Sequence, residues 1–281
     1  IASPASLTTV DGLGALQTVG GALAVRWMPA LNDLSGFTSL TSIGGAVTFA
    51  NNSSLTNLVD AFPALQSIGG ALSFASNANL GALGGFNALT EINGALSFSW
   101  NGVSDITGFA ALQDIDGDVT FANNSGFSGL SGFSGPNPLT IDGDLRFQSN
   151  TGSALGIPVA LSGFGALREI DGDLAFSWTS AFNGITGFGA LEAVDGDLSF
   201  ANCTVAAITG PLALTDIGGD LILSSNQGLA SLSGLSGVDE VGGDFTITWN
   251  GSLPTAAAQA LRDSIGVNDI GGTISIANNG P

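Results

Sequence analysis

Apolar and polar positions repeat along this chain with a period of about 25 residues. Each repeat carries a block of the form Leu-x-x-(Ile/Val)-x-Gly-x-(Leu/Val)-x-Phe, as in ALTEINGALSFSWN (88–101) and ALQDIDGDVTFANN (111–124). The central Ile or Val, here called the anchor, occurs eleven times at intervals of 23 to 29 residues, at positions 19, 43, 68, 92, 115, 141, 170, 194, 217, 241 and 270. A fixed period of this length is typical of a solenoid, whose units bury their apolar faces only against their neighbours.

Within one repeat the pattern predicts a strand with one buried face. After the anchor Ile92, Leu96 and Phe98 are expected to point into the core, and Ser97 and Ser99 to point outward, because side chains alternate along a strand. A second apolar pair follows after a turn, so each repeat supplies at least two inward-facing segments.

The turn after the strand holds an Asn in most repeats: Asn52, Asn77, Asn101, Asn124, Asn150, Asn226, Asn250 and Asn279. Met28, Thr179 and Cys203 take this place in the other three repeats. A side-chain amide there can bond its own backbone and the next repeat, so we expect a buried ladder of amides. Cys203 is interpreted as a member of this ladder, and the alternative is a reactive thiol.

The block I-x-G-x-L-x-F-x-x-N-x-x-L-x-x-L-x-G-F resembles the receptor L-domain, the leucine-rich-like β-helix of growth-factor and insulin receptor ectodomains. The Leu-x-Phe-x-x-Asn spacing also matches the strand portion of leucine-rich repeats. The resemblance covers nearly the whole chain and implies a secreted or surface-exposed role in binding or scaffolding. This chain departs from the family in having no disulfide framework and a longer stack.

These observations predict an all-β fold, a right-handed β-solenoid of about eleven rungs that resembles leucine-rich and receptor L-domain geometry. The rungs would stack over about 50 Å at ordinary strand spacing. The Ala-rich segment 254–265 begins with Pro and predicts a short helix in the C-terminal cap. The segment 151–163 is expected to form a protruding loop. One domain, 1–281, is expected, made of an N-terminal cap (1–18), repeats (19–250), and the helix with the last rung (251–281).

Charge limits the partners of such a solenoid. The chain has 23 acidic residues and four basic ones, no Lys, and a net charge of −19. That charge argues against nucleic acid and anionic lipid as partners. No run of 18 apolar residues predicts a membrane span. A first residue other than Met suits a mature secreted form or a trimmed chain, and we expect a secreted or cell-surface protein.

Composition also argues against enzyme chemistry. The chain has no His, no Lys and no Tyr, which removes the commonest general bases and Ser-His triads. The carboxylates form regular columns with no unique cluster beside a cleft. We therefore predict a non-enzymatic protein without a cofactor.

The outward strand positions form the first candidate surface. Of 22 such positions, 18 are Ser, Thr or Ala, and the exceptions are Arg26, Arg146, Gln148 and Ile222. The candidate ligand-binding residues are Thr48, Ala50, Ser73, Ala75, Ser97, Ser99, Thr120, Ala122, Ser199, Ala201, Thr246 and Thr248. A flat array of small groups could order water and match ice. The alternatives are that small residues simply suit a tight solenoid, or that another chain, including a second copy of this one, covers the face.

A three-repeat cycle forms the second candidate surface. The residue before each ladder position reads Trp, Asn, Ser without error through all eleven repeats, and it places Trp27, Trp100, Trp178 and Trp249 in one row. Exposed aromatic rings about 14 Å apart could stack on sugar rings or anchor a repetitive partner such as a matrix protein. The alternative is duplication of a three-repeat unit whose Trp packs on its neighbours.

Stacked carboxylates form the third candidate surface, with one column made of Asp118, Asp144, Asp173, Asp197, Asp220 and Asp244. A second column holds Asp116, Asp142, Asp171 and Asp195. Calcium prefers such oxygen ligands, so the six Asp residues of the first column are candidate Ca²⁺ ligands. The alternative is a solvated, turn-forming acidic edge, because the Asp-Gly-Asp pattern lacks the denser signature of calcium repeats.

Two function classes follow. The first is an extracellular or cell-surface scaffold, adhesion or recognition module that binds a glycan or a matrix protein. The second is an ice-binding, antifreeze protein that uses the Ser/Thr/Ala strand face. Asn-x-Ser/Thr sequons begin at Asn51, Asn52, Asn123, Asn202 and Asn250, and would permit glycosylation in a eukaryotic secretory pathway.

Overall fold

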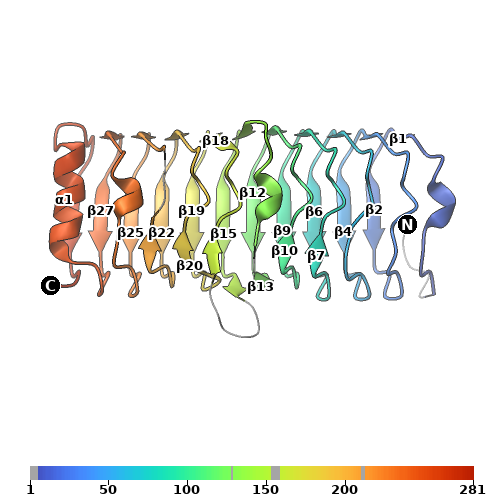
Figure 1. The fold of residues 1–281 in the computed structure, drawn as a ribbon, viewed down its shortest axis with the longest axis horizontal. Coiled ribbons are helices and arrows are strands. Elements are labelled where there is room, and N and C mark those ends of the chain that lie inside the picture. The colour runs from blue at the N-terminus through green and yellow to red at the C-terminus, as the bar shows by residue number, and fades with distance from the viewer. Residues whose placement is uncertain (1–5, 128, 153–158, 210–212) are drawn as a thin grey trace.

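The computed structural model describes residues 6–127, 129–152, 159–209 and 213–281. The chain forms a parallel β-solenoid with turns of about 24 residues and one short C-terminal helix (Figure 1). Successive turns lie side by side in chain order, so each contacts the turn before it and the turn after it. The predicted repeat architecture is confirmed.

The longest sheet runs the length of the stack. Its eleven parallel strands are β2 (Leu23–Arg26), β4 (Val47–Ala50), β6 (Leu72–Ala75), β9 (Leu96–Ser99), β12 (Val119–Ala122), β15 (Leu145–Gln148), β19 (Leu174–Ser177), β22 (Leu198–Ala201), β25 (Leu221–Ser224), β27 (Phe245–Thr248) and β28 (Ile274–Ala277). Every neighbouring pair keeps the same register without a bulge; for example, Phe98 lies opposite Phe121. Each of the eleven predicted repeats therefore contributes one strand to this sheet.

The anchors build a second sheet. Its ten strands are β1 (Thr18–Val19), β3 (Ser42–Ile43), β5 (Ser67–Ile68), β8 (Glu91–Ile92), β11 (Asp114–Ile115), β14 (Leu139–Ile141), β18 (Leu167–Ile170), β21 (Ala193–Val194), β24 (Asp216–Ile217) and β26 (Glu240–Val241). The eleventh anchor, Ile270, makes a single bridge to Val241. A Gly two residues after the anchor lets neighbouring turns approach closely. A Cβ at Gly94 would lie 2.9 Å from backbone atoms of the previous turn.

The third side of each turn is less regular. It holds three small sheets made from β7 (Ala82–Leu83) with β10 (Asp105–Ile106), β13 (Ser125–Phe127) with β16 (Thr151–Gly152), and β17 (Val159–Leu161), β20 (Phe182–Ile185) and β23 (Ala207–Ile208). The short 3-10 helices η2 (Ser131–Phe133) and η3 (Ser233–Leu235) interrupt it. Residues 153–158 of the predicted protruding loop lie outside the described residues, and both of its flanks form short strands.

Two columns of Phe rings fill the interior. Phe49, Phe74, Phe98, Phe121, Phe147, Phe176 and Phe200 stack with ring centroids 4.5–5.2 Å apart. Phe37, Phe62, Phe86, Phe109, Phe133, Phe164 and Phe188 form a parallel column. Rings of the two columns meet edge to face, as Phe49 does with Phe62 at 5.8 Å. Both arrangements suit the quadrupoles of aromatic rings and make one continuous core.

The predicted amide ladder is confirmed. Asn101 Nδ2 donates to the Phe74 carbonyl at 2.9 Å, and Asn101 Oδ1 accepts from the backbone N–H of Asn77 at 3.0 Å. The same pattern continues along the turns in both directions. Thr179 is also buried and its hydroxyl donates to the Phe147 carbonyl. Each ladder member thus satisfies buried backbone groups of a neighbouring turn.

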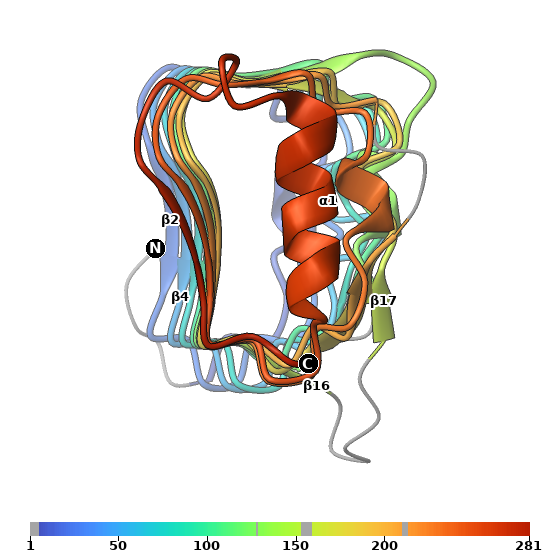
Figure 2. The same cartoon turned by 90° about the vertical axis from the view of Figure 1, so that its left-hand side faces the viewer.

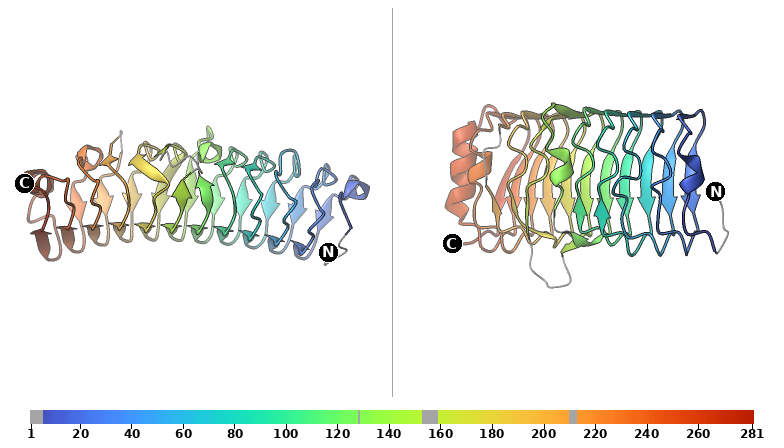
Figure 3. Two further views of the ribbon diagram at one scale, coloured as in Figure 1. Left: turned by 90° about the horizontal axis from the view of Figure 1, so that it is seen from below. Right: turned by 45° about the vertical axis from the view of Figure 1, so that its right-hand side comes forward.

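Helix α1 (Thr255–Ile265) forms the third side of the last turn at the C-terminal end of the stack, on the side away from the long sheet (Figure 2). Ala258, Leu261 and Ile265 form its buried face, and Pro254 occupies the N-cap position. The predicted helix at 254–265 is confirmed. At the N-terminal end, η1 (Asp11–Leu13) precedes the first complete turn. The whole stack is gently curved along its length (Figure 3).

Candidate functional site

A left-handed backbone position follows every strand of the long sheet. Its residues have φ between 52° and 60° and are Trp27, Asn51, Ser76, Trp100, Asn123, Ser149, Trp178, Asn202, Ser225, Trp249 and Asn278. These are the residues of the Trp-Asn-Ser cycle. The position forms the turns at the arrowhead ends of the strands in Figure 1. We call this row of turns the tryptophan edge.

Hydrogen bonds between turns fix the backbone of this edge. The Trp100 N–H donates to the Ala122 carbonyl of the next turn at 3.0 Å, and Trp27 and Trp178 donate in the same way. The following residue, Asn101, is locked into the buried amide ladder. The amide-ladder residue that follows and the strand that precedes therefore fix the left-handed residue, with its side chain outside the core.

The four Trp side chains are the largest apolar groups that the described surface exposes. Trp27, Trp100, Trp178 and Trp249 are 62%, 64%, 65% and 57% exposed. A left-handed conformation costs a residue with a Cβ about 1–2 kcal/mol, and Asn tolerates it better. Other turns of the same edge use Asn at the same position. Each Trp therefore keeps more than half of its surface exposed and also has an unfavourable backbone conformation, so packing on neighbouring residues is a weak explanation for Trp at this position.

Two shallow grooves open along this edge. One, of about 450 Å³, is lined by Trp27, Pro29, Asn51, Ser53 and Ser76. The other, of about 430 Å³, is lined by Trp178, Asn202, Cys203, Thr204, Ser225, Gln227 and Gly228. Each groove spans three turns and contains one complete Trp-Asn-Ser unit. The two grooves are thus copies of one arrangement, six turns apart.

The polar side chains of these grooves are neutral, and some of them have partners within the protein: Gln227 donates to the Trp249 carbonyl at 2.8 Å, and Thr204 donates to the Phe182 carbonyl at 3.3 Å. In the described part of the chain, the side chains of Asn51, Ser76, Asn202 and Ser225 make no hydrogen bond. No carboxylate and no basic group lines either groove. An aromatic ring, a primary amide and a hydroxyl therefore face solvent together.

The sequence predicted the Trp row but missed the other groove residues. Pro29, Ser53, Thr204 and Gln227 each come directly after a ladder position. This spacing could have identified them from the sequence, because a residue that follows a buried ladder residue on a turn points outward.

The strand face has the predicted orientation. Its outward positions are half-buried in most strands, as at Ser97 and Ser99, while the alternating residues are fully buried. Ala50 is an exception at 8% exposure. The other candidate residues of this face, Thr48, Ser73, Ala75, Thr120, Ala122, Ser199, Ala201, Thr246 and Thr248, lie in two rows across the sheet. Arg26 at one end donates to the Thr48 hydroxyl at 3.1 Å.

The first Asp column forms a ladder of its own. Each of Asp118, Asp144, Asp173, Asp197, Asp220 and Asp244 accepts, through Oδ1, the N–H of the corresponding residue in the next turn at 2.6–3.0 Å. The acidic column therefore also links neighbouring turns through hydrogen bonds, which the sequence interpretation of a solvated, turn-forming edge did not include. Hydrogen bonds from N–H groups and the spacing of the turns offset the repulsion between carboxylates.

The close approach of neighbouring turns accounts for the glycine before each Asp, as it does for Gly94, which precedes Ala95. A Cβ at Gly196 would lie 2.5 Å from Asp173 Oδ1, and a Cβ at Gly219 would lie 2.3 Å from Asp197 Oδ1. The Asp-Gly-Asp pattern is thus explained by close packing between turns. It does not require a bound ion.

Arg146 interrupts the strand face beside this ladder. Its guanidinium lies 2.5 Å from Asp144, 3.4 Å from Asp173 and 3.6 Å from Asp118. The unusual Arg in the middle of the small-residue face is therefore paired with three carboxylates of the Asp ladder.

Carboxylates close enough to share a cation occur in the neighbouring column. The two clusters are Asp114, Asp116 and Asp142, and Glu169, Asp171 and Asp195. Desolvation, followed by the charges of Asp114, Asp171 and Asp116, raises the pKa of Asp142 above its ordinary value. The six Asp residues that the sequence suggested for Ca²⁺ belong to the hydrogen-bonded ladder and not to these two clusters, and exposed acidic clusters are common without an ion.

Cys203 occupies the ladder as predicted. Its N–H donates to Asn226 Oδ1 at 2.9 Å, and its thiol lies 3.4 Å from the Ala201 carbonyl. Burial raises the pKa of the thiol, which disfavours the reactive thiolate.

The Asn residues of the sequons differ in burial. Asn52 and Asn250 are fully buried in the amide ladder, whereas Asn51, Asn123 and Asn202 lie at the surface of the tryptophan edge.

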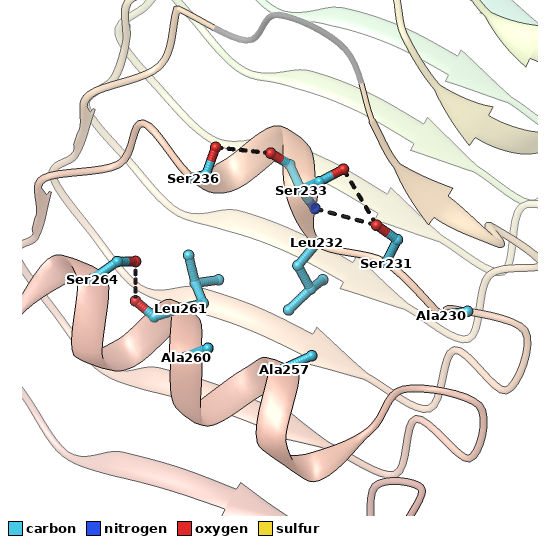
Figure 4. A pocket seen from close by; sticks show the side chains of 9 residues that line it. All are labelled: Ala230, Ser231, Leu232, Ser233, Ser236, Ala257, Ala260, Leu261 and Ser264. Carbon is cyan, nitrogen blue, oxygen red and sulfur yellow. Dashed lines mark hydrogen bonds between the residues drawn. The ribbon is translucent and has the colours of Figure 1, made fainter.

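A further hollow lies beside helix α1 on the third side of the last turns. It has a volume of about 310 Å³ and lies between α1 and η3, with Leu232, Leu261 and Ala257 on its floor and Ser residues at its rim (Figure 4). The Ser231 and Ser233 hydroxyls bond each other at 3.3 Å. This hollow has no charged lining residue and resembles a packing gap between the cap and the stack.

No family model, no curated protein and no solved structure matches this chain. Among the described residues, no helix is long and apolar enough to cross a membrane.

Proposed function

We propose that this protein is a non-enzymatic recognition module, secreted or at the cell surface, that binds an extended partner such as a glycan or a matrix protein along the tryptophan edge. The observation that carries the proposal is the row of four Trp side chains, each more than half exposed on a left-handed turn. Exposed aromatic groups are common anchors of binding surfaces. The absence of His, Lys and Tyr supports a role without catalysis.

The finer identity of the fold belongs to the same proposal. We infer a right-handed solenoid related to receptor L-domains and leucine-rich repeats, since parallel crossover connections are overwhelmingly right-handed. The buried amide ladder after each strand supports this relation, and so does the Leu-x-Phe-x-x-Asn spacing. The relation in turn supports an extracellular location, as do the surface sequons at Asn51, Asn123 and Asn202.

Substitution of the central Trp pair tests the proposal. Trp100→Asn with Trp178→Asn places at each site the residue that other turns already use there. We expect the double variant to keep its fold or gain thermal stability, since Asn tolerates the left-handed region, while partner binding falls at least tenfold. Binding would be screened on glycan and matrix-protein arrays, with circular dichroism as the folding check.

A strand-face double variant, Ser97→Gln with Ser199→Gln, is the matched control and should bind normally. Intrinsic fluorescence offers a direct readout, because the chain has four Trp and no Tyr and all four lie on this edge. A partner that binds without altering Trp fluorescence, and that the Trp variants still bind, would exclude the tryptophan edge as the binding surface.

Ice binding through the strand face is the second candidate. The observation that favours it is the unbroken register of eleven strands, which aligns Ser, Thr and Ala in two rows at about 4.8 Å spacing. The gentle curvature of the stack and the paired Arg146 interrupt a flat match to a lattice (Figure 3).

Thermal hysteresis tests the second candidate. If the strand face binds ice, the purified protein at micromolar concentration will shape ice crystals and open a gap between melting and freezing. Thr120→Arg on the strand face would then abolish the gap, and Trp100→Asn would leave it intact. Disc-shaped crystal growth without a gap would exclude this function.

A further inference from the structure

The two grooves of the tryptophan edge restrict the chemistry of the partner. Resting on the proposed function, we propose that the tryptophan edge binds a neutral polysaccharide chain that runs parallel to the solenoid axis, with one subsite for every three turns. The reasons are the periodicity of the edge, the groups within each groove and the distribution of charge.

Periodicity favours a polymer of identical units. Trp27, Trp100, Trp178 and Trp249 recur every three turns, so adjacent rings are about 14 Å apart along the axis. A globular protein partner has no translational repeat, and its hot spots gather near the centre of an interface instead of spreading along a line. A polysaccharide presents the same ring at regular intervals and can occupy successive subsites.

The groups within each groove match a sugar. The face of an indole ring carries negative quadrupole charge and attracts the polarised C–H groups on one face of a pyranose ring. Asn51 and Ser76 in one groove, and Asn202 and Ser225 in the other, offer amide and hydroxyl groups that lack a hydrogen bond within the described chain. Amides donate and accept, as the hydroxyl groups of a sugar do.

Charge selects a neutral sugar over an acidic one. Neither groove is lined by a basic side chain, so a carboxylate or sulfate would find no counter-ion. The net charge of −19 also repels a polyanion as it approaches. The grooves lack carboxylates of their own, which distinguishes them from a site for basic peptides.

Repetition along one edge makes chain length the deciding variable. An oligosaccharide that contacts one Trp gains one weak subsite. A chain long enough to span about 14 Å reaches a second Trp as an intramolecular event, and linked sites of this kind raise affinity by about 10²–10⁴. Affinity should therefore rise in a step as chain length crosses that span.

The experiment is a fluorescence titration of the full chain, produced in a bacterial host so that its sequons stay unmodified. The probes are a length series of neutral β-glucan oligosaccharides, the parent β-glucan, a neutral galactomannan, and a polyuronate as the anionic control. We expect quenching or a blue shift of Trp emission with a neutral polymer, at least tenfold tighter binding once the chain spans two Trp, and no binding of the polyuronate.

Variants separate the inference from the proposed function. Trp100→Asn with Trp178→Asn should weaken binding of the long polymer more than tenfold and abolish the length step, while Ser97→Gln with Ser199→Gln changes neither. The protein could instead bind a protein partner and no neutral polysaccharide, and lose that binding when the Trp residues are replaced. This result would overturn the polysaccharide inference and leave the recognition proposal standing. If the Trp variants bound polysaccharide and protein partners as tightly as the unsubstituted protein does, the polysaccharide inference and the recognition proposal would both be overturned. Tighter binding of the polyuronate than of the neutral polymers would also overturn the inference.

Discussion

At the scale of single residues, two adjacent positions perform opposite tasks. The ladder position needs a buried side chain that donates and accepts, and the preceding position needs a left-handed backbone with its side chain outside. Asn101 and Trp100 show the contrast, with exposures of 2% and 64%. The ladder residue contributes to stability, while the Trp adds conformational cost and exposed apolar area. Only the ladder residue is explained by folding.

Removal of one ladder amide should be costly. In Asn101→Ala, the Phe74 carbonyl and the Asn77 N–H lose their partner inside the core. Unsatisfied buried groups cost about 1–3 kcal/mol each, so we expect the free energy of unfolding to fall by at least ~2 kcal/mol. Chemical denaturation measures the change. Asn101→Thr, which copies Thr179, should cost less, and Ser97→Ala should cost nearly nothing; equal effects of all three would contradict the ladder's role.

At the scale of elements, the corner between the two sheets combines an attractive and a repulsive column of carboxylates. The Asp118 column accepts backbone N–H groups in every turn from its first member onward. The neighbouring column gathers carboxylates such as Asp116 and Asp142 within 4.8 Å of each other. One column therefore ties turns together, and in the other the nearby carboxylates raise the pKa of Asp142.

Asp142 provides a pH test of the repulsive column. Its pKa is raised above 3.8 by desolvation and by Asp114, Asp171 and Asp116, so the folded state binds the proton more tightly than the unfolded state. The folded state accordingly loses stability as pH rises through the raised pKa. Asp142→Asn should then increase the midpoint of urea unfolding at pH 7, and the increase should vanish below pH 3.8, where both side chains are neutral.

Asp33 supplies the opposite control. Its carboxylate accepts the Ser35 N–H at 2.8 Å, and this bond, with one from the Ser35 side chain, lowers the pKa. The stability from this carboxylate is present above the unfolded pKa and is lost as pH falls through the lowered value. Asp33→Asn should therefore reduce stability at neutral pH. If Asp142→Asn and Asp33→Asn both raised, or both lowered, the urea midpoint at pH 7, this explanation of the two pKa shifts would be contradicted.

At the scale of the whole molecule, charge is distributed unevenly along a uniform core. Residues 1–95 carry four acidic side chains and one Arg, and the remaining nineteen acidic residues and three Arg lie beyond them. The Phe columns continue through both halves without interruption of stacking from Phe49 to Phe200. The tryptophan edge has members in both halves, so its periodicity is independent of the charge distribution. A neutral ligand is the kind that such an edge can bind along its full length.

The sequence by itself determined the solenoid, the strand alternation, the amide ladder and the C-terminal helix. These features depend on neighbouring turns in fixed register, and a period repeated eleven times places equivalent residues above one another whatever the details of the turn. Met28, Thr179 and Cys203 could be assigned to the ladder for the same reason.

Only the tertiary structure decided what the polar columns do. Whether Asp144 is solvated or bonded depends on the direction of an N–H group in the next turn, and this direction is not encoded in spacing. The exposure of Trp100 depends on the sign of φ at the turn. The grooves depend on which residues from three successive turns lie close together. Periodicity specifies which residues are neighbours, but backbone geometry sets whether they face the core, each other or the solvent.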